Sequence, residues 1–322
     1  QRLLLSATIS NIQISDSAFG SVWSPDGRYL AFGVSEFNEG DLNNDGDSDD
    51  RIAHILDSET SVLRNLEIEV DELFWSPNSE TVIVDNFLQS SQAYHVQTDS
   101  LRDLGVGGSV RWSEDGRWAS LSVWEDDDGV DLNADGDLDD RVLHVFDSES
   151  GQVTNLGVDH ASYGWSPGSH HLAVLVVEAG QGNTPLNGDG DADDQVLHVY
   201  NALSGNLVNV GLVVSNFWRW SPTAGQIVFD VNEGEQGDGD LIEENRIGGR
   251  PRKPDDAGED EHLIAPRLDR RDDELRVWEV GIIELPDLAR FESRLFLHMH
   301  AGAEQCGTQE EYPSHSDRKS VV

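Results

Sequence analysis

Short apolar segments alternate with polar turns along most of the chain, at the length and spacing of β-strands. A Trp followed by Ser ends one such segment five times, at Trp23, Trp75, Trp112, Trp165 and Trp220. The intervals between these Trp residues are 52, 37, 53 and 55 residues. A repeat of this length indicates an array of supersecondary units rather than independent elements.

Each repeat divides into four predicted strands. The first ends at the Trp and is followed by a turn of the Ser-Pro-Asp-Gly type, in which Pro presets one φ angle and Gly tolerates another. The second is an apolar run such as "RYLAFGV" or "HLAVLVV", and the third is "RIAHILD", "AYHVQTD", "RVLHVFD" or "QVLHVYN". The fourth, such as "SVLRNL" or "QVTNLG", leads into the next Trp segment. The sequence therefore predicts an all-β fold, a β-propeller of four-stranded blades with five recognisable repeats.

The "WSPDGRYLAF" and "LHVFD" units resemble the WD-like, PD40-type repeats of TolB-like β-propellers, which also accompany the catalytic domain of dipeptidyl-peptidase-like enzymes. The resemblance covers roughly residues 1–231 and implies a fold rather than a function. Residues 1–14 fit the second half of a further blade, whereas the last repeat keeps only its first two strands, near residues 216–231. Either this N-terminal half-blade closes the ring, or the chain is a fragment of a six- to eight-bladed parent. We favour the fragment, because five-bladed rings are less usual.

Three repeats carry an acidic insertion between their second and third strands: "DLNNDGDSDDR" (residues 41–51), "DLNADGDLDDR" (131–141) and "PLNGDGDADDQ" (185–195). Oxygen ligands at alternating positions, with Gly at the sixth, suit a hard cation such as calcium. Carboxylates packed this densely also repel one another unless a cation is present. The predicted ligands are Asp41, Asn43, Asp45, Asp47 through its backbone carbonyl, and Asp49 in the first loop; Asp131, Asn133, Asp135, Asp137 and Asp139 in the second; and Asn187, Asp189, Asp191 and Asp193 in the third.

The loops differ from an EF-hand, whose twelfth position is a bidentate Glu, because Ile52 or Val142 stands there. Their spacing resembles instead the calcium loops of integrin-type FG-GAP propellers, although only the loop chemistry transfers. The third loop has Pro185 in place of the first Asp, and the fifth repeat keeps only part of the pattern in "GEQGDGDLIEEN". We therefore expect two to three structural calcium ions per chain.

Two sets of recurring aromatic residues invite a functional interpretation. His54, His95, His144 and His198 occupy the same place in four third strands. Residues that recur once per blade lie around a ring rather than together, so we interpret these His residues, like the five Trp residues, as packing residues. Trp118, Trp124 and Trp218 lie outside the repeat position and either line a binding surface or belong to the core.

Composition limits the partners. The formal net charge is −41 in 322 residues, which repels nucleic acids and anionic membrane surfaces. The single Cys excludes an intrachain disulfide, and no apolar run is long enough for a membrane span. We divide the chain into a β-propeller over residues 1–245 and a tail over residues 246–322, where both Lys residues, the only Cys and the only Met fall. Within the tail, "ELRVWEVGII" predicts a strand and "LPDLARFESRLFLHMH" a short helix.

No nucleophile elbow, zinc-protease motif or phosphate-binding loop occurs in the sequence. We expect a non-enzymatic module that binds a protein, peptide or carbohydrate at the propeller face. Calcium loops without the EF-hand Glu suit extracellular calcium concentrations, so we expect a secreted, periplasmic or cell-surface location. Two alternatives stay open: the accessory propeller of a secreted dipeptidyl-peptidase-like hydrolase whose catalytic domain is absent from this chain, and a lyase-like or lactonase-like enzyme with a metal in the channel.

Overall fold

The computed structural model describes residues 20–87, 89–168, 170–222, 226–231, 246–247, 250–251, 267–269 and 276–284. These residues form antiparallel β-sheets, which confirms the predicted all-β class. Two helical turns, α1 (Glu36–Glu39) and α2 (Glu125–Asp128), follow second strands, and the sequence predicts neither because four residues are too few to show a helical period. Within the described ranges, no helix has the length and apolar character needed to cross a membrane.

The first two repeats form separate four-stranded sheets. The first contains β1 (Val22–Trp23), β2 (Tyr29–Ser35), β3 (Arg51–Asp57) and β4 (Val62–Glu69). The second contains β5 (Glu72–Trp75), β6 (Thr81–Asp85), β7 (Gln92–His95) and β8 (Ser100–Asp103). In both sheets the strands pair in sequence order, as the repeat pattern predicts.

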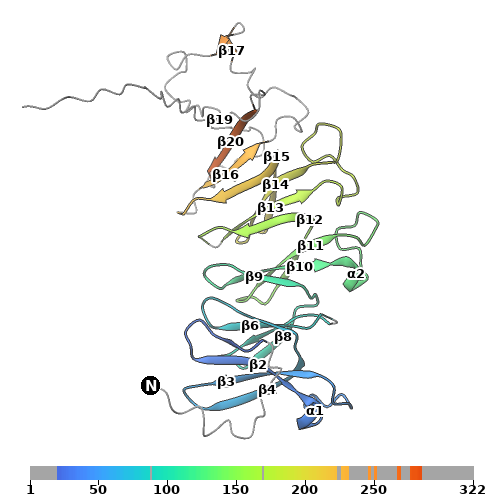
Figure 1. The fold of residues 1–322 in the computed structure, drawn as a ribbon, viewed down its shortest axis with the longest axis vertical. Helices are drawn as coiled ribbons and strands as arrows, with labels where there is room; N and C mark the ends of the chain where they lie inside the picture. Colours follow the sequence, from blue (N-terminus) through green and yellow to red (C-terminus); the bar gives the residue numbers. More distant parts are fainter. Residues whose placement is uncertain are drawn as a thin grey trace, which may run out of the picture.

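The later repeats merge into one ten-stranded sheet. Its strands are β9 (Ser109–Trp112), β10 (Trp118–Trp124), β11 (Arg141–Asp147), β12 (Val153–Trp165), β13 (His171–Val177), β14 (Gln195–Asn201), β15 (Asn206–Trp220), β16 (Gln226–Val231), β19 (Arg267–Asp269) and β20 (Arg276–Glu284). The repeats merge because β12 and β15 are long: the first part of each pairs with the strand before it and the last part with the strand after it. Figure 1 shows the successive sheets following one another along the longest axis of the molecule.

Part of the tail joins the last repeat. β20, predicted as a strand from "ELRVWEVGII", pairs with β16, so that Ile227 faces Ile283. β19 pairs with the other edge of β20, and the tail also contains a separate pair of two-residue strands, β17 (Arg246–Ile247) and β18 (Arg250–Pro251). The half-blade predicted at residues 1–14 and the helix predicted at "LPDLARFESRLFLHMH" lie outside the described residues.

The apolar core lies between successive sheets. One cluster combines Tyr29 and Ile55 of the first sheet with Val82 and Tyr94 of the second, and a similar cluster joins the second sheet to the third repeat. Because strands present alternate side chains to opposite faces, a sheet between two others packs against a neighbour on both sides, as the second sheet does. The described repeats therefore form a continuous series in which every internal sheet is covered.

The geometry of the turn after the Trp explains why Ser, Asp and Gly occur there. In the first repeat the Ser24 hydroxyl donates to Asp26 Oδ1 over 2.5 Å, and Asp26 Oδ1 in turn accepts from the Arg28 N–H over 3.0 Å. Gly27 takes φ = 74°, which a side chain would disfavour. Ser113, Asp115 and Gly116 repeat this arrangement in the third repeat.

The repeated Trp residues link the sheets by one recurring hydrogen bond. Each indole N–H donates to the backbone carbonyl of the residue that precedes the Trp of the previous repeat. The pairs are Trp75 to Val22 at 3.1 Å, Trp112 to Phe74 at 3.1 Å, Trp165 to Arg111 at 3.1 Å and Trp220 to Gly164 at 2.9 Å. This confirms that four of the five repeated Trp residues pack between repeats, and it shows that they also link each sheet to the next; Trp23, in the first described repeat, is 43% exposed.

We predict that Trp75→Phe lowers the free energy of unfolding by about 1–2 kcal/mol, because it removes the N–H donor and leaves space beside Tyr29, against which the indole stacks. Trp23→Phe is the matched control, since Trp23 is 43% exposed, and we expect it to change stability by less than about 0.5 kcal/mol. Urea unfolding followed by circular dichroism measures both. Equal losses in the two variants would show that the link between sheets contributes nothing.

Candidate metal sites

The three acidic loops share a feature that precedes the predicted ligands: each begins with a buried Glu at the end of the second strand. Glu36, Glu125 and Glu178 follow β2, β10 and β13 directly, and all three are 0% exposed. A carboxylate is seldom fully buried unless it is paired with a cation or a metal. These three buried carboxylates therefore require a cation or a metal ion as a partner.

One oxygen of each buried Glu holds the start of its loop. Glu36 Oε1 accepts hydrogen bonds from the N–H groups of Leu42, at 2.5 Å, and Asn43, at 3.3 Å. In the second loop Glu125 Oε1 accepts from Leu132 and Asn133, and in the third Glu178 Oε1 accepts from Leu186 and Asn187. The repeated Leu-Asn of the loop sequences is thus the point at which the loop attaches to the Glu.

The other oxygen behaves differently in the three loops. Glu36 Oε2 and Glu125 Oε2 are buried and have no hydrogen-bond partner within the part of the chain that the structure describes. Glu178 Oε2 accepts the N–H of Asp194 at 3.3 Å. An unpartnered buried carboxylate oxygen costs free energy in the absence of a counter-charge, so the first two loops have the strongest requirement for a cation.

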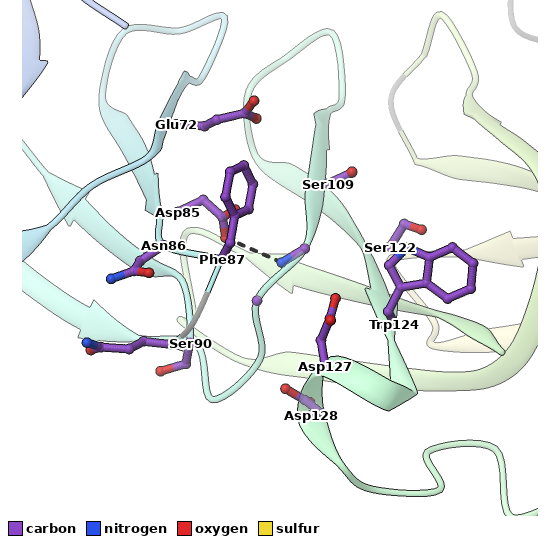
Figure 2. A pocket seen from close by; sticks show the side chains of 13 residues that line it. Glu72, Asp85, Asn86, Phe87, Ser90, Ser109, Ser122, Trp124, Asp127 and Asp128 are labelled. Atoms are coloured by element: carbon purple, nitrogen blue, oxygen red, sulfur yellow. Dashed lines mark hydrogen bonds between the residues drawn. The ribbon is translucent and has the colours of Figure 1, made fainter. Parts of the chain in front are cut away.

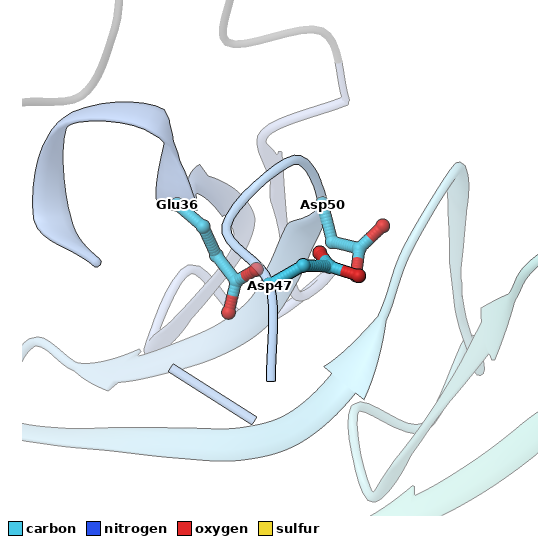
Figure 3. A group of neighbouring side chains, drawn as sticks. All are labelled: Glu36, Asp47 and Asp50. Carbon is cyan, nitrogen blue, oxygen red and sulfur yellow. The ribbon is translucent and has the colours of Figure 1, made fainter. Parts of the chain in front are cut away.

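Carboxylates converge on each buried Glu, and they form three equivalent triads. One oxygen from each member lies within 4.8 Å of the others; the triads are Glu36, Asp47 and Asp50; Glu125, Asp137 and Asp140; and Glu178, Asp191 and Asp194. Figure 3 shows Glu36 reaching from the start of α1 towards Asp47, with Asp50 beside it. These triads can hold metal ions. Asp45, Asp50 and Glu69 form a further group in the first loop.

Proximity and burial change the acidity of these groups. Burial, together with the negative charges of Glu69 and Asp47, raises the pKa of Asp50 to about 6. Burial and the negative charge of Asp159 raise the pKa of Asp140 to about 7, even though a hydrogen bond from Asn133 lowers it. Both shifts indicate that the ionised form is disfavoured without a cation.

The alternating Asp and Asn residues also shape the loop backbone. Asp41 accepts hydrogen bonds from the N–H groups of Asn44 and Gly46, at 2.5 and 3.1 Å. Asn43 Oδ1 accepts from the Asp45 N–H, and Asp45 Oδ1 from the Asp47 N–H. The sixth-position glycine has φ = 107°, and its equivalents in the other loops have 109° and 103°, a conformation that favours Gly.

The predicted ligands therefore fall into two groups. Asp45, Asp47, Asp137 and Asp191 belong to the carboxylate groups described above. For Asp47 the group contains the side-chain carboxylate, whereas the sequence predicts a ligand through the backbone carbonyl. The others lie in the same loops outside these groups, and their role as ligands stays a prediction; they are Asp41, Asn43, Asp49, Asp131, Asn133, Asp135, Asp139, Asn187, Asp189 and Asp193. The residues 234–245 of the fifth repeat lie outside the described part of the chain.

Two members of every triad are not among the ligands predicted from the sequence. The buried Glu lies five to seven residues before the loop motif, and the second missed member is the Asp at the tenth loop position, Asp50, Asp140 or Asp194. Both signals are present in the sequence: a Glu follows the apolar second strand in all three repeats, and every loop ends in Asp-Asp. The EF-hand comparison looks for the Glu after the loop, whereas here it comes before.

The second and third loops are in direct contact. Asn133 Nδ2 donates to the Gly180 carbonyl at 2.8 Å, and the Gly182 N–H donates to Asp135 Oδ2 at 3.0 Å. A side chain at Gly180 would collide with the carboxylates of Asp140 and Asp159. The two loops therefore support each other across neighbouring repeats.

The recurring His residues are built into the sheets. His54, His144 and His198 are 7%, 3% and 6% exposed, and each Nδ1 faces the backbone carbonyl two residues earlier at 2.9, 3.4 and 3.1 Å. Burial lowers the pKa of all three. They occupy irregular points of the strand pairing, and their burial confirms that they are packing residues. The prediction that His95 shares their place is wrong: His95 ends β7, is half-buried and pairs with Thr81, as Asp57 pairs with Tyr29 in the first sheet.

The carboxylate triads and the repeated sheets are the features of the described residues that bear on function. A comparison with models of known protein families finds no match, and a comparison with curated proteins finds no relative.

Proposed function

We propose that this chain is a calcium-binding extracytoplasmic β-propeller that acts as a non-enzymatic binding or scaffold module. One observation carries the metal-binding part of the proposal: a fully buried Glu carboxylate meets two Asp carboxylates in three repeats, and in the first and third repeats one oxygen of this Glu has no hydrogen-bond partner among the described residues. Without a cation these oxygens would repel one another in a poorly solvated place. Acidic turns on a solvated surface need no buried Glu.

Calcium fits the donor set better than other common cations. The groups that converge are carboxylates, and backbone carbonyls and amide oxygens lie in the same loops, so all candidate donors are oxygen. Calcium accepts six to eight oxygen ligands in flexible geometry, whereas magnesium requires a near-ideal octahedron and keeps several waters. The remaining predicted ligands, such as Asp41 and Asp49, are the candidates to complete the coordination.

The ion would have a structural role. Each loop joins the second strand to the third, and the triad brings together residues from both ends of the loop. A cation there holds the loop closed against the sheet. Sites of this type suit calcium at roughly 10⁻⁴–10⁻³ M, the range of extracellular modules, which supports a secreted, periplasmic or cell-surface location.

The propeller part of the proposal is supported by the repeat architecture. Successive four-stranded units pack face to face, and the same Trp hydrogen bond links each unit to the next. In a propeller the connections between second and third strands lie on one face. The metal loops would therefore shape the surface at which a protein, peptide or carbohydrate ligand binds.

Calcium titration of the chelator-treated chain by isothermal calorimetry, with metal analysis after dialysis, tests the metal-binding proposal. Because the triads occupy three loops, we expect roughly two to three calcium ions per chain, and no displacement by an equal concentration of magnesium. Less than one bound ion per chain, or equal affinity for both metals, would contradict the proposal.

A further inference from the structure

A pocket of about 450 Å³ lies between the second and third repeats. Its wall on one side comes from β5 and the segment after β6, and on the other from the end of β10 and α2 (Figure 2). The pocket is next to the second acidic loop, because its lining residue Trp124 directly precedes Glu125 of the second triad. The carboxylates of that triad do not line it.

The floor of the pocket is firmly built. Asp85 is 2% exposed, and its Oδ1 accepts hydrogen bonds from the Ser91 hydroxyl and from the Gly108 N–H, the latter at 3.3 Å. A Cβ on Gly107 would come within 2.7 Å of the Gln89 carbonyl oxygen, and one on Gly108 would collide with the backbone of Ser122. Both glycines allow the backbone to approach closely, so the shape of the floor is set by packed main chain.

The charged residues that line the pocket are all acidic. Glu72, Asp85, Asp127 and Asp128 are among the lining residues, and Arg, Lys and His are not. Glu72, Asp127 and Asp128 are exposed, and Figure 2 shows Glu72 and Asp127 on opposite sides of the pocket. A ligand that enters between them meets negative charge from two directions, so its complement is a cation.

Two exposed aromatic side chains accompany these carboxylates. Phe87 is 63% exposed and Trp124 is 43% exposed, and both line the pocket. Arg141 already lies over the Trp124 ring, 4.4 Å from its centroid, so this ring takes part in a cation–π contact within the protein. The Phe87 ring offers an open apolar surface to the stem of a long side chain, and its face attracts a cation.

The spacing of the carboxylates argues against a metal ion here. Among the described residues, none of the pocket carboxylates belongs to a group of three whose oxygens converge within 4.8 Å. Charges spread around a pocket with aromatic walls suit a larger, delocalised cation. We propose that this pocket binds the guanidinium of an Arg side chain in a peptide segment of a partner protein. The inference rests on the proposed role of the chain as a binding module and not on its metal sites.

The test uses the full chain in calcium and the peptide acetyl-Gly-Gly-Arg-Gly-Gly-amide, with a citrulline peptide of the same length as the neutral isostere. Saturation-transfer NMR of the peptides detects weak binding and gives the dissociation constants. Because a chain of net charge −41 attracts any cation, the titrations are repeated at about 0.5 M salt, where long-range attraction is screened. We expect the Arg peptide to bind at least about tenfold more tightly than the citrulline peptide under both conditions.

The double variant Glu72→Gln with Asp127→Asn should weaken binding of the Arg peptide about tenfold, whereas Asp126→Asn should leave it unchanged. Asp126 is the matched control because it is exposed on the same helical turn and does not line the pocket. Equal binding of the two peptides, no binding to the parent chain, or equal losses in the pocket variant and the control would each overturn the proposal. Calcium titrations of the same samples separate it from the metal sites: calcium uptake without peptide binding removes only the pocket, and peptide binding without calcium uptake removes only the metal sites.

Discussion

Removal of calcium is expected to lower the melting temperature of this chain by about 10 °C or more. A ligand that binds only the folded state stabilises it by about 2.7 kcal/mol when its free concentration is a hundredfold above the dissociation constant. Two or three such contributions add if the sites are independent, and each kcal/mol corresponds to about 2–4 °C for a domain of this size. Differential scanning calorimetry of the chain in calcium and in excess chelator measures the shift.

Magnesium is the control for this first prediction. The same melt in magnesium should resemble the chelated sample, because magnesium requires a near-ideal octahedron and retains several waters, whereas calcium accepts many protein oxygens in flexible geometry. A melting temperature that is unchanged by chelation, to within about 2 °C, would show that the carboxylate triads are stable without a metal.

The second large effect is the change in stability caused by Glu125→Gln, which we expect to have opposite signs in calcium and in chelator. In calcium, the variant should be less stable than the parent, because it loses a charged ligand of the second site. In chelator it should be more stable, by about 1–3 kcal/mol, because the buried and unpartnered Glu125 Oε2 is removed. Chemical denaturation with and without calcium measures both differences.

Two further variants sharpen this comparison. Asp126→Asn removes a neighbouring charge that is exposed, so it should behave alike in both buffers. Glu178→Gln should gain less in chelator than Glu125→Gln, because Glu178 Oε2 already accepts the Asp194 N–H. If Glu125→Gln were less stable than the parent in both buffers by the same amount, the buried carboxylate would have a packing role unrelated to metal.

Local sequence patterns predict the strands of the repeats well. The segments "RIAHILD", "RVLHVFD" and "QVLHVYN" coincide with β3, β11 and β14, because alternation and β-branched residues are properties of a few neighbouring positions. The partner of β20 is not predictable in this way. β16 and β20 are separated by more than forty residues of chain, and nothing in either segment specifies the other.

The metal triads show the same division between local and non-local information. Asp45 and Asp47 are found from the loop motif, because their spacing is local. Glu36 is missed because its relation to the loop depends on the position at which β2 ends, and only the folded sheet shows that it is buried there. A search for a Glu at the end of the second strand in every repeat with a loop would have found all three.

The recurring tryptophan hydrogen bond and the acidic insertions use different parts of each unit. It always joins the same two points of neighbouring units, whereas the insertions leave from the connection between second and third strands. An acidic insertion can therefore be gained, lost or altered in one unit without changing the tryptophan hydrogen bond that joins this unit to its neighbour. The second unit, whose β6 and β7 are joined without such an insertion, makes the same bond on both sides: Trp75 donates to Val22, and Phe74 accepts from Trp112.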